Sequence, residues 1–291
     1  MAYDLAEPAM TERRFKSQDG LDLYYRDYAP IAPETGLPVV CLHALTRNSR
    51  DFELVAPRIA SLGRRVLVPD VRGRGKSARD PNADRYAPAV YVQDLLVMMD
   101  AVSVPRAVFV GTSMGGIVTM LLAVMARPRI AAAVLNDVGP VLEETGLKRI
   151  AGYVGKSTEF ASWEEAERAI RGTQANVFPK APDAFWPVFT RRVCRALPDG
   201  RVAFDYDPAI ARPFATTSAP DMTPLFEALA STPILTVRGA LSDLLSAEGV
   251  ELMRLVKADM AAVEVANVGH APTLEEPEAW NALVDFLAAA P

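Results

Sequence analysis

The chain has 291 residues, of which 50% are hydrophobic and 23% are charged, and its formal net charge is −5. This length and composition fit one large globular domain, or one domain with an insertion, that buries a sizeable core. The acidic balance, without a basic cluster, argues against nucleic acid or an anionic membrane as the main partner.

The N-terminal residues contain no basic segment followed by an apolar one, and no later stretch holds eighteen uncharged apolar residues. The sequence therefore predicts neither a signal peptide nor a membrane span, and we expect a cytoplasmic protein. Cys41 falls in a predicted core strand and Cys194 in a predicted helix, which suits reduced thiols better than a disulfide framework. Two cysteines and two histidines also argue against a structural zinc site, so no metal is expected.

Short apolar segments alternate with amphipathic ones over the first half of the chain. A hairpin is predicted at 13–29, where Asp19-Gly20 separates two strand-like runs. Further strands are predicted at 37–43, 64–70, 106–111 and 130–137, with helices at 51–61, at 88–102 and from 114 onward. Buried strands that alternate with helices imply a doubly wound, mostly parallel α/β sheet with helices on both faces.

This alternation stops after Pro140 and resumes at 232. Residues 140–231 have a helical but irregular pattern, with several prolines and half of the aromatic residues of the chain. Strands are again predicted at 232–239 and 261–269, followed by a helix at 277–289. We therefore predict an α/β core domain of residues 1–139 and 232–291, with a helical cap, or lid, inserted at 140–231.

Ser113 lies between a predicted strand and a predicted helix, with a glycine two residues away on each side. A direct turn from strand to helix needs an unusual backbone, and Gly111, Gly115 and Gly116 let the two elements approach closely. Gly-x-Ser-x-Gly in this setting is typical of a nucleophile elbow, which exposes a serine hydroxyl beside a helix N-terminus. The alternative interpretation is a tight turn whose serine only caps the helix.

A serine nucleophile needs a base, normally histidine, and a carboxylate that fixes the tautomer of that base. The chain has two histidines. His270 follows the last predicted strand, and loops after parallel strands gather at the edge of the sheet where ligands bind, so His270 is the expected base. His43 ends an early strand and is expected to be a structural residue beside the site.

The carboxylate is expected between serine and histidine in chain order, after the end of a strand. Asp243 and Asp137 both meet this condition and remain alternatives on these grounds. Acyl transfer also needs two N–H donors for the oxyanion. The expected donors are the backbone N–H groups of Met114, directly after the serine, and of Leu45, on the loop after His43.

These residues together resemble the α/β-hydrolase superfamily over nearly the whole chain, in particular its capped esterase, lactonase and C–C hydrolase branches. The resemblance rests on His43-Ala44-Leu45, "DVRGRGKS", "GTSMGG", the Asp243 loop and "GHAPTLEEPE". It implies Asp243 as the acid of a Ser113–His270–Asp243 triad and requires no cofactor. Many relatives have glycine where Ala44 stands.

The sequence therefore predicts a serine hydrolase that cleaves a small or medium carboxylic ester or lactone through an acyl-enzyme. C–C bond hydrolysis on the same fold is one alternative, and a hydrolase-fold ligand receptor with little turnover is another. Residues 72–77 end like a nucleotide-binding P-loop, but that motif needs glycine where Asp70 stands. The expected partner is a small-molecule ester or lactone, and the sequence specifies neither the natural substrate nor the oligomeric state.

The aromatic residues of the predicted cap suggest a pocket with apolar walls. Arg191, Arg192 and Arg195 are predicted on one helix. Such a cluster is more often a solvated face than a clamp for a substrate carboxylate. Apolar walls without an anion clamp favour an uncharged acyl chain.

Overall fold

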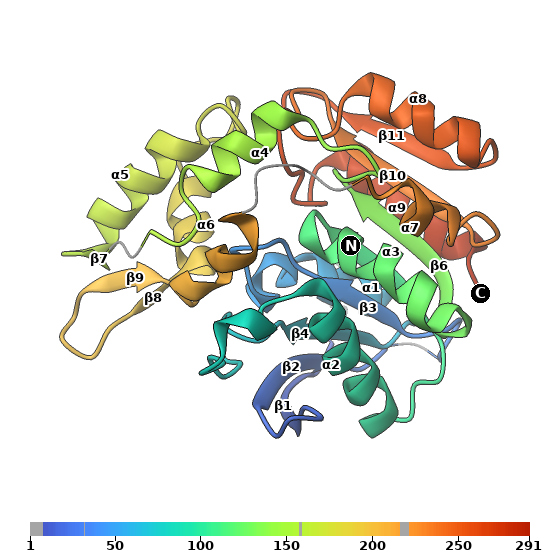
Figure 1. Cartoon of the computed structure of the whole chain (residues 1–291), viewed down its shortest axis with the longest axis horizontal. Helices are drawn as coiled ribbons and strands as arrows, with labels where there is room; N and C mark the ends of the chain where they lie inside the picture. The colour runs from blue at the N-terminus through green and yellow to red at the C-terminus, as the bar shows by residue number, and fades with distance from the viewer. Residues whose placement is uncertain (1–7, 32, 157–158, 216–220) are drawn as a thin grey trace, which may run out of the picture.

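The computed structural model describes residues 8–31, 33–156, 159–215 and 221–291, and Figure 1 shows their arrangement. Residues 1–7 and 32 of the predicted core and 157–158 and 216–220 of the predicted cap lie outside this description. The main sheet has the strand order β1-β2-β4-β3-β5-β6-β10-β11. Its strands are β1 (Met10–Lys16), β2 (Asp22–Tyr28), β3 (Val39–Leu42), β4 (Val66–Asp70), β5 (Ala107–Thr112), β6 (Ile130–Asn136), β10 (Ile234–Gly239) and β11 (Ala261–Val265).

The predicted hairpin and the predicted parallel sheet are both confirmed. β2 is antiparallel to β1 and to β4, whereas the pairs from β4 to β11 are parallel. Gly20 in the hairpin turn has a φ of +83°, a conformation that glycine adopts without strain. The parallel strands, from β4 to β11 in the sheet order, place their carboxyl ends at one edge of the sheet. The loops that follow β3, β4, β5, β6, β10 and β11 leave from that edge.

Helices cover both faces of the sheet (Figure 1). Val39 and Cys41 of β3 belong to one apolar cluster, and Val40 and Leu42 to another, because successive side chains of a strand point to opposite faces. The first cluster contains residues of α1 (Val55–Ser61) and α9 (Pro277–Ala289). The second contains residues of α2 (Pro88–Ala101), α3 (Met114–Ala126), α7 (Thr223–Glu227) and α8 (Ala247–Val256).

The segment between β6 and β10 lies mainly at one side of the sheet, on the left in Figure 1. It contains α4 (Glu144–Ala151), α5 (Trp163–Gln174), α6 (Phe185–Val193) and α7, with a small antiparallel sheet of β7 (Glu159–Phe160), β9 (Val202–Phe204) and β8 (Cys194–Ala196). Short 3-10 helices complete the chain: η1 (Ser49–Phe52), η2 (Ala83–Arg85), η3 (Arg127–Arg129) and η4 (Pro208–Ala215).

Two details of this segment differ from the sequence-based expectation. Cys194 begins β8 and does not lie in a helix, because its backbone is extended, with φ −119° and ψ 164°. Arg195 is therefore on a strand, so Arg191, Arg192 and Arg195 do not share one helix. In addition, α7 belongs to the segment predicted as the cap, but it packs on α3, and its Phe226 is buried in the core of the main sheet.

None of the helices in the described ranges is long and apolar enough to cross a bilayer.

Candidate active site

The turn from β5 to α3 places Ser113 in a strained backbone conformation, with φ 51° and ψ −111°. Glycines make this turn sterically possible. A Cβ on Gly115 would lie 2.1 Å from the carbonyl oxygen of Leu42, and a Cβ on Gly111 would lie 2.5 Å from the backbone of Gly115. A non-glycine residue held at positive φ marks a position that the surrounding structure enforces. The strand–turn–helix context predicted for Ser113 is present.

His270 lies in hydrogen-bonding contact with Ser113. Its Nε2 is 2.9 Å from Ser113 Oγ, and its Nδ1 is 2.7 Å from Oδ2 of Asp137. Asp137 is completely buried, whereas Ser113 and His270 are 7% and 9% exposed. With Nδ1 protonated and donating to Asp137, the free lone pair of Nε2 points at the serine hydroxyl.

The choice of Asp243 as the partner of His270 is contradicted by this geometry and is corrected to Asp137. The Asp137 carboxylate also accepts hydrogen bonds from Gly239 N at 2.8 Å and from Ser242 Oγ at 2.6 Å. These two donors lie on and after β10, so they hold the carboxylate in place from the neighbouring strand. The carboxylate is thereby oriented so that its Oδ2 also faces His270 Nδ1.

Asp243 is instead paired with Arg149 of α4. Arg149 Nε and Nη2 lie 2.5 and 2.8 Å from the two carboxylate oxygens, a bidentate arrangement. The hydrogen bonds from Arg149 lower the pKa of Asp243. The partner lies 94 positions away in the sequence. The sequence did contain one relevant signal: β6 is apolar until Asn136, and Asp137 follows directly, beside Val237 of β10.

His43 is a buried structural histidine, as expected for its position. Its Nδ1 is 2.7 Å from the carbonyl oxygen of Ala44, and its Nε2 accepts a hydrogen bond from Val71 N at 3.1 Å. Burial lowers the pKa of His43 to about 3, so the ring is neutral at physiological pH. The neutral ring ties the loop after β3 to the loop after β4.

The expected oxyanion donors are Leu45, which lines the same cavity as Ser113, and Met114, which follows Ser113 directly. Met114 is the first residue of α3, so its N–H belongs to the helix-terminal groups that have no partner within the helix. Arg74 is buried and donates from Nε to the carbonyl oxygen of Leu45 at 2.9 Å. Arg74 belongs to the "RGRGKS" turn, so this hydrogen bond holds the Leu45 loop against that turn.

A cavity of about 330 Å³ opens at Ser113 and His270. Its walls come from the main sheet and from the segment between β6 and β10, including Phe160, Ile170 and Phe189. The expected solvated face is wrong for Arg192, which lines this cavity and is only 4% exposed. Within the described ranges, no group of three or more metal-ligating side chains lies close together.

Arg192 pairs with two carboxylates, whereas its Nη2 has no hydrogen-bond partner among the described residues. Its Nε lies 2.9 Å from Glu53 and its Nη1 2.6 Å from Glu275. Arg47, on the loop after β3, pairs with Asp51 at 3.0 Å and stacks on the ring of Phe189, with Cζ 4.4 Å from its centroid. Neither Arg47 nor these partners were predicted from the sequence. Their proximity depends on how α6 (Phe185–Val193) folds over the loop after β3.

These observations define an α/β protein with a serine, a histidine and a carboxylate in line at the carboxyl edge of its sheet. The family profile described as "alpha/beta hydrolase fold" matches residues 38–189. The 3-hydroxybutyrate-oligomer hydrolase of Cupriavidus necator is 35% identical over 250 residues, covering 82% of this chain and 84% of that protein. An esterase of Escherichia coli is 34% identical over 104 residues, which cover 36% of this chain and 39% of that protein.

A solved structure of an α/β hydrolase from Novosphingobium aromaticivorans is 43% identical, with a TM-score of 0.90. The match covers 96% of this chain and 98% of that chain. The chain therefore belongs to the α/β-hydrolase fold family, and it is a hydrolase.

Proposed function

We propose that the chain is a serine hydrolase that cleaves small or medium carboxylic esters, including oligoesters of hydroxy acids and lactones, through an acyl-enzyme. The proposal is carried by the hydrogen-bonded line from Ser113 through His270 to Asp137. A serine hydroxyl in this arrangement has a base within reach of its proton, and the base has a fixed tautomer.

In the first half of the reaction, Ser113 Oγ attacks the carbonyl carbon of the ester while its proton passes to His270 Nε2. Asp137 orients the ring and stabilises the imidazolium that forms. The N–H groups of Leu45 and Met114 stabilise the negative oxygen of the tetrahedral intermediate. When the intermediate collapses, the alcohol leaves with the proton from His270, and the acyl group remains on Ser113.

In the second half, water replaces the alcohol. His270 accepts a proton from the water as its oxygen attacks the acyl carbon, and it returns that proton to Ser113 Oγ as the carboxylic acid departs. No step in this sequence requires a metal or an organic cofactor. The predicted cap would act as the wall that encloses the acyl chain, since α4 to α6 contribute Ile150, Ile170 and Phe189 to the cavity.

The relative from Cupriavidus necator, named as a hydrolase of 3-hydroxybutyrate oligomers, supports oligoesters as substrates. The C–C hydrolase alternative is weakened by the charges in the cavity. A dienoate carries a carboxylate close to the reacting carbonyl, but Arg192 already has two carboxylate partners. The receptor alternative is weakened because the nucleophile, base and acid are all in contact.

A turnover assay with p-nitrophenyl butyrate, combined with labelling by a serine-directed phosphonate, tests this proposal. We expect many turnovers per enzyme molecule and a single phosphonylated peptide, identified by mass spectrometry, that contains Ser113. Ser113→Ala should lower kcat by several orders of magnitude and abolish the label, whereas Ser61→Ala, at an exposed serine of α1, should change neither. Equal labelling of Ser113→Ala, or a single turnover per molecule in the unmodified enzyme, would reject the proposal.

A further inference from the structure

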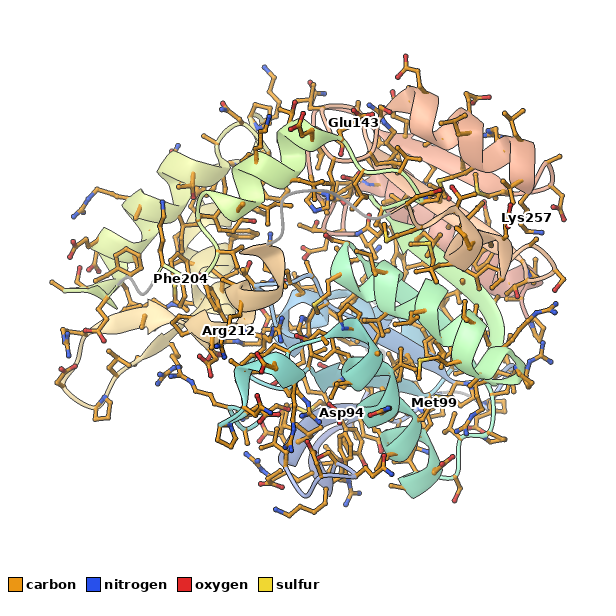
Figure 2. All side chains as sticks on the ribbon, viewed as in Figure 1. Asp94, Met99, Glu143, Phe204, Arg212 and Lys257 are labelled. Carbon is orange, nitrogen blue, oxygen red and sulfur yellow. The ribbon has the colours of Figure 1, made fainter. Side chains whose placement is uncertain are left out.

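A second depression of about 100 Å³ adjoins the active-site cavity. We call it the outer groove; its charged lining residues are Arg79, Lys156, Glu159 and Arg195. Lys156, Phe204 and Tyr206 line both the cavity and the outer groove, so the two spaces share one wall. Phe204 projects from the small sheet of the segment between β6 and β10 (Figure 2). A substrate that extends out of the cavity past Phe204 would enter the outer groove.

The outer groove has a surplus of positive charge. Among the residues that the structure describes, no carboxylate lies within 4.0 Å of a charged nitrogen of Arg79 or Lys156. Glu159, the acidic residue of the lining, is already paired with Arg201. Arg195 lies 3.6 Å from Asp205, but Asp205 has a closer partner in Arg50, at 2.6 Å.

Apart from Lys156 in the shared wall, the charged residues of the cavity show no such surplus. Arg47 is paired with Asp51, and Arg192 is paired with Glu53 and Glu275. A third carboxylate beside Arg192 would be repelled by the two already there. The charges therefore disfavour an anion next to the reacting carbonyl and favour an anion farther out, beyond the wall formed by Phe204 and Tyr206.

We propose that the outer groove binds the terminal carboxylate of an oligoester of hydroxy acids. This inference rests on the proposed ester hydrolase function. Cleavage of such an oligoester adds one water across the ester bond and releases a hydroxy acid from the carboxylate end. In this arrangement the acyl side lies in the cavity, the scissile carbonyl lies at Ser113, and the leaving hydroxy acid extends toward Lys156, Arg79 and Arg195. The groove thus selects for free-acid oligomers over neutral ones.

The experiment compares a trimer of 3-hydroxybutyrate with a free terminal carboxylate and the same trimer as its methyl ester. Because Lys156 and Arg79 are exposed, each is expected to contribute a few-fold preference, so the ratio of kcat/KM for acid over methyl ester should be about 10. The ratio should fall to about 1 in the double variant Lys156→Gln/Arg79→Gln and should fall strongly in 1 M salt. Lys180→Gln, at an exposed lysine outside the groove lining, is the matched control and should keep the ratio of the unmodified enzyme.

Binding measured by calorimetry with Ser113→Ala separates the groove from catalysis. We expect the acid to bind about 10-fold more tightly than the methyl ester, and this difference to disappear when Lys156→Gln and Arg79→Gln are added. Hydrolysis of both trimers at equal rates, with equal affinities, would overturn the groove assignment and leave the ester hydrolase function intact. Absence of ester hydrolysis together with a preserved affinity difference would overturn the hydrolase function and support the groove.

Discussion

At the scale of single residues, Asp137 is positioned by contacts that Asp243 lacks. Asp137 has a positive φ of 57°, so the chain turns sharply at the end of β6 and directs the side chain toward His270. Gly239 N and Ser242 Oγ occupy other acceptor positions of the same carboxylate. A completely buried carboxylate has lost its hydrating water, and such donors replace the hydrogen bonds that water would make. The side chain of Asp137 is therefore held by hydrogen bonds from the end of β10 and the loop after it, although Asp137 itself follows β6.

We expect Asp137→Asn to lower kcat about 10⁴-fold, because asparagine presents His270 with the wrong hydrogen-bonding partner. The matched change Asp243→Asn removes a charge from the neighbouring loop, and we expect it to change kcat less than 10-fold. Steady-state kinetics with p-nitrophenyl butyrate at pH 7.5 measure both variants. A larger loss in Asp243→Asn than in Asp137→Asn would return the acid to the position that the family resemblance implied.

His43 predicts a dependence of stability on pH. Its folded-state pKa of about 3 lies below the ordinary value of about 6.5, so between these values the unfolded chain binds more protons than the folded one. The free energy of unfolding is therefore expected to fall as pH falls below about 6.5. For this residue alone, the loss between pH 7 and pH 5 should be about 2 kcal/mol.

Urea unfolding at pH 7 and pH 5 measures this loss in the unmodified protein and in His43→Gln. The variant is expected to be less stable at both pH values, because it loses the contact with Val71 N. It should nevertheless lose about 2 kcal/mol less between pH 7 and pH 5, since glutamine does not titrate. An unchanged pH dependence in the variant would contradict a lowered pKa of His43 in the folded state.

At the scale of elements, α4 (Glu144–Ala151) is docked on the loop after β10 through its backbone and one side chain. Gly146 N donates to Asp243 O at 2.9 Å, and Arg149 pairs with the Asp243 side chain. A Cβ at Gly146 would lie 2.5 Å from Asp243 O, so only glycine allows this approach. Ile150 at the end of α4 and Tyr153 just after it line the cavity. The docking of α4 therefore influences the wall of the cavity.

We expect Gly146→Ala to displace α4, to lower the melting temperature by several degrees and to raise KM for p-nitrophenyl butyrate by several-fold, with a smaller change in kcat. The matched control is Gly172→Ala in α5, where an added Cβ meets nothing within 4 Å. This change should stabilise the protein by about 0.4–1 kcal/mol, because alanine loses less conformational entropy in a helix. Thermal unfolding and kinetics of both variants give the comparison. Similar effects of the two changes would contradict the close packing of α4.

The sequence predicts well those helices and strands whose own run of apolar residues is enough to identify them. β5 and α3 are apolar runs joined by three glycines, and both their identity and their junction at Ser113 were predictable. β8 and β9 were not, since each is three residues long and depends on pairing across a turn within an otherwise helical segment. Strand formation there is decided by the partner strand, which the local sequence does not specify.

Across the whole molecule, the residues of the site that could be predicted are those specified by the local sequence. The residues that could not be predicted depend on partners far away in the chain. Ser113 and His270 were identified because their positions after strands have few competitors. The partner of His270 had two candidates on adjacent loops, and the pairing of Asp243 with Arg149, distant in sequence, could not be predicted. The role of Arg192 was also hidden, because its partners Glu53 and Glu275 come from opposite ends of the chain.

The size and the walls of the cavity predict the range of substrates. Its volume of about 330 Å³ and its apolar walls accommodate an acyl chain of limited length. Each added methylene should lower the free energy of the transition state by about 0.8 kcal/mol, which raises kcat/KM roughly fourfold, until the cavity is full. We therefore expect p-nitrophenyl butyrate and hexanoate to be hydrolysed faster than the acetate, and the palmitate ester to be a poor substrate.

Amides and carboxylated dienoates should be poor substrates in the same assay, the dienoates because the carboxylates paired with Arg192 would repel their anionic group. Parallel kcat/KM measurements on the ester series, an anilide and a ring-fission dienoate test this order. Efficient turnover of the dienoate that is lost in Arg192→Gln would contradict the ester assignment, because it would show that this arginine clamps a carboxylate beside the reacting carbonyl. The reaction would then be C–C bond hydrolysis at the same Ser113.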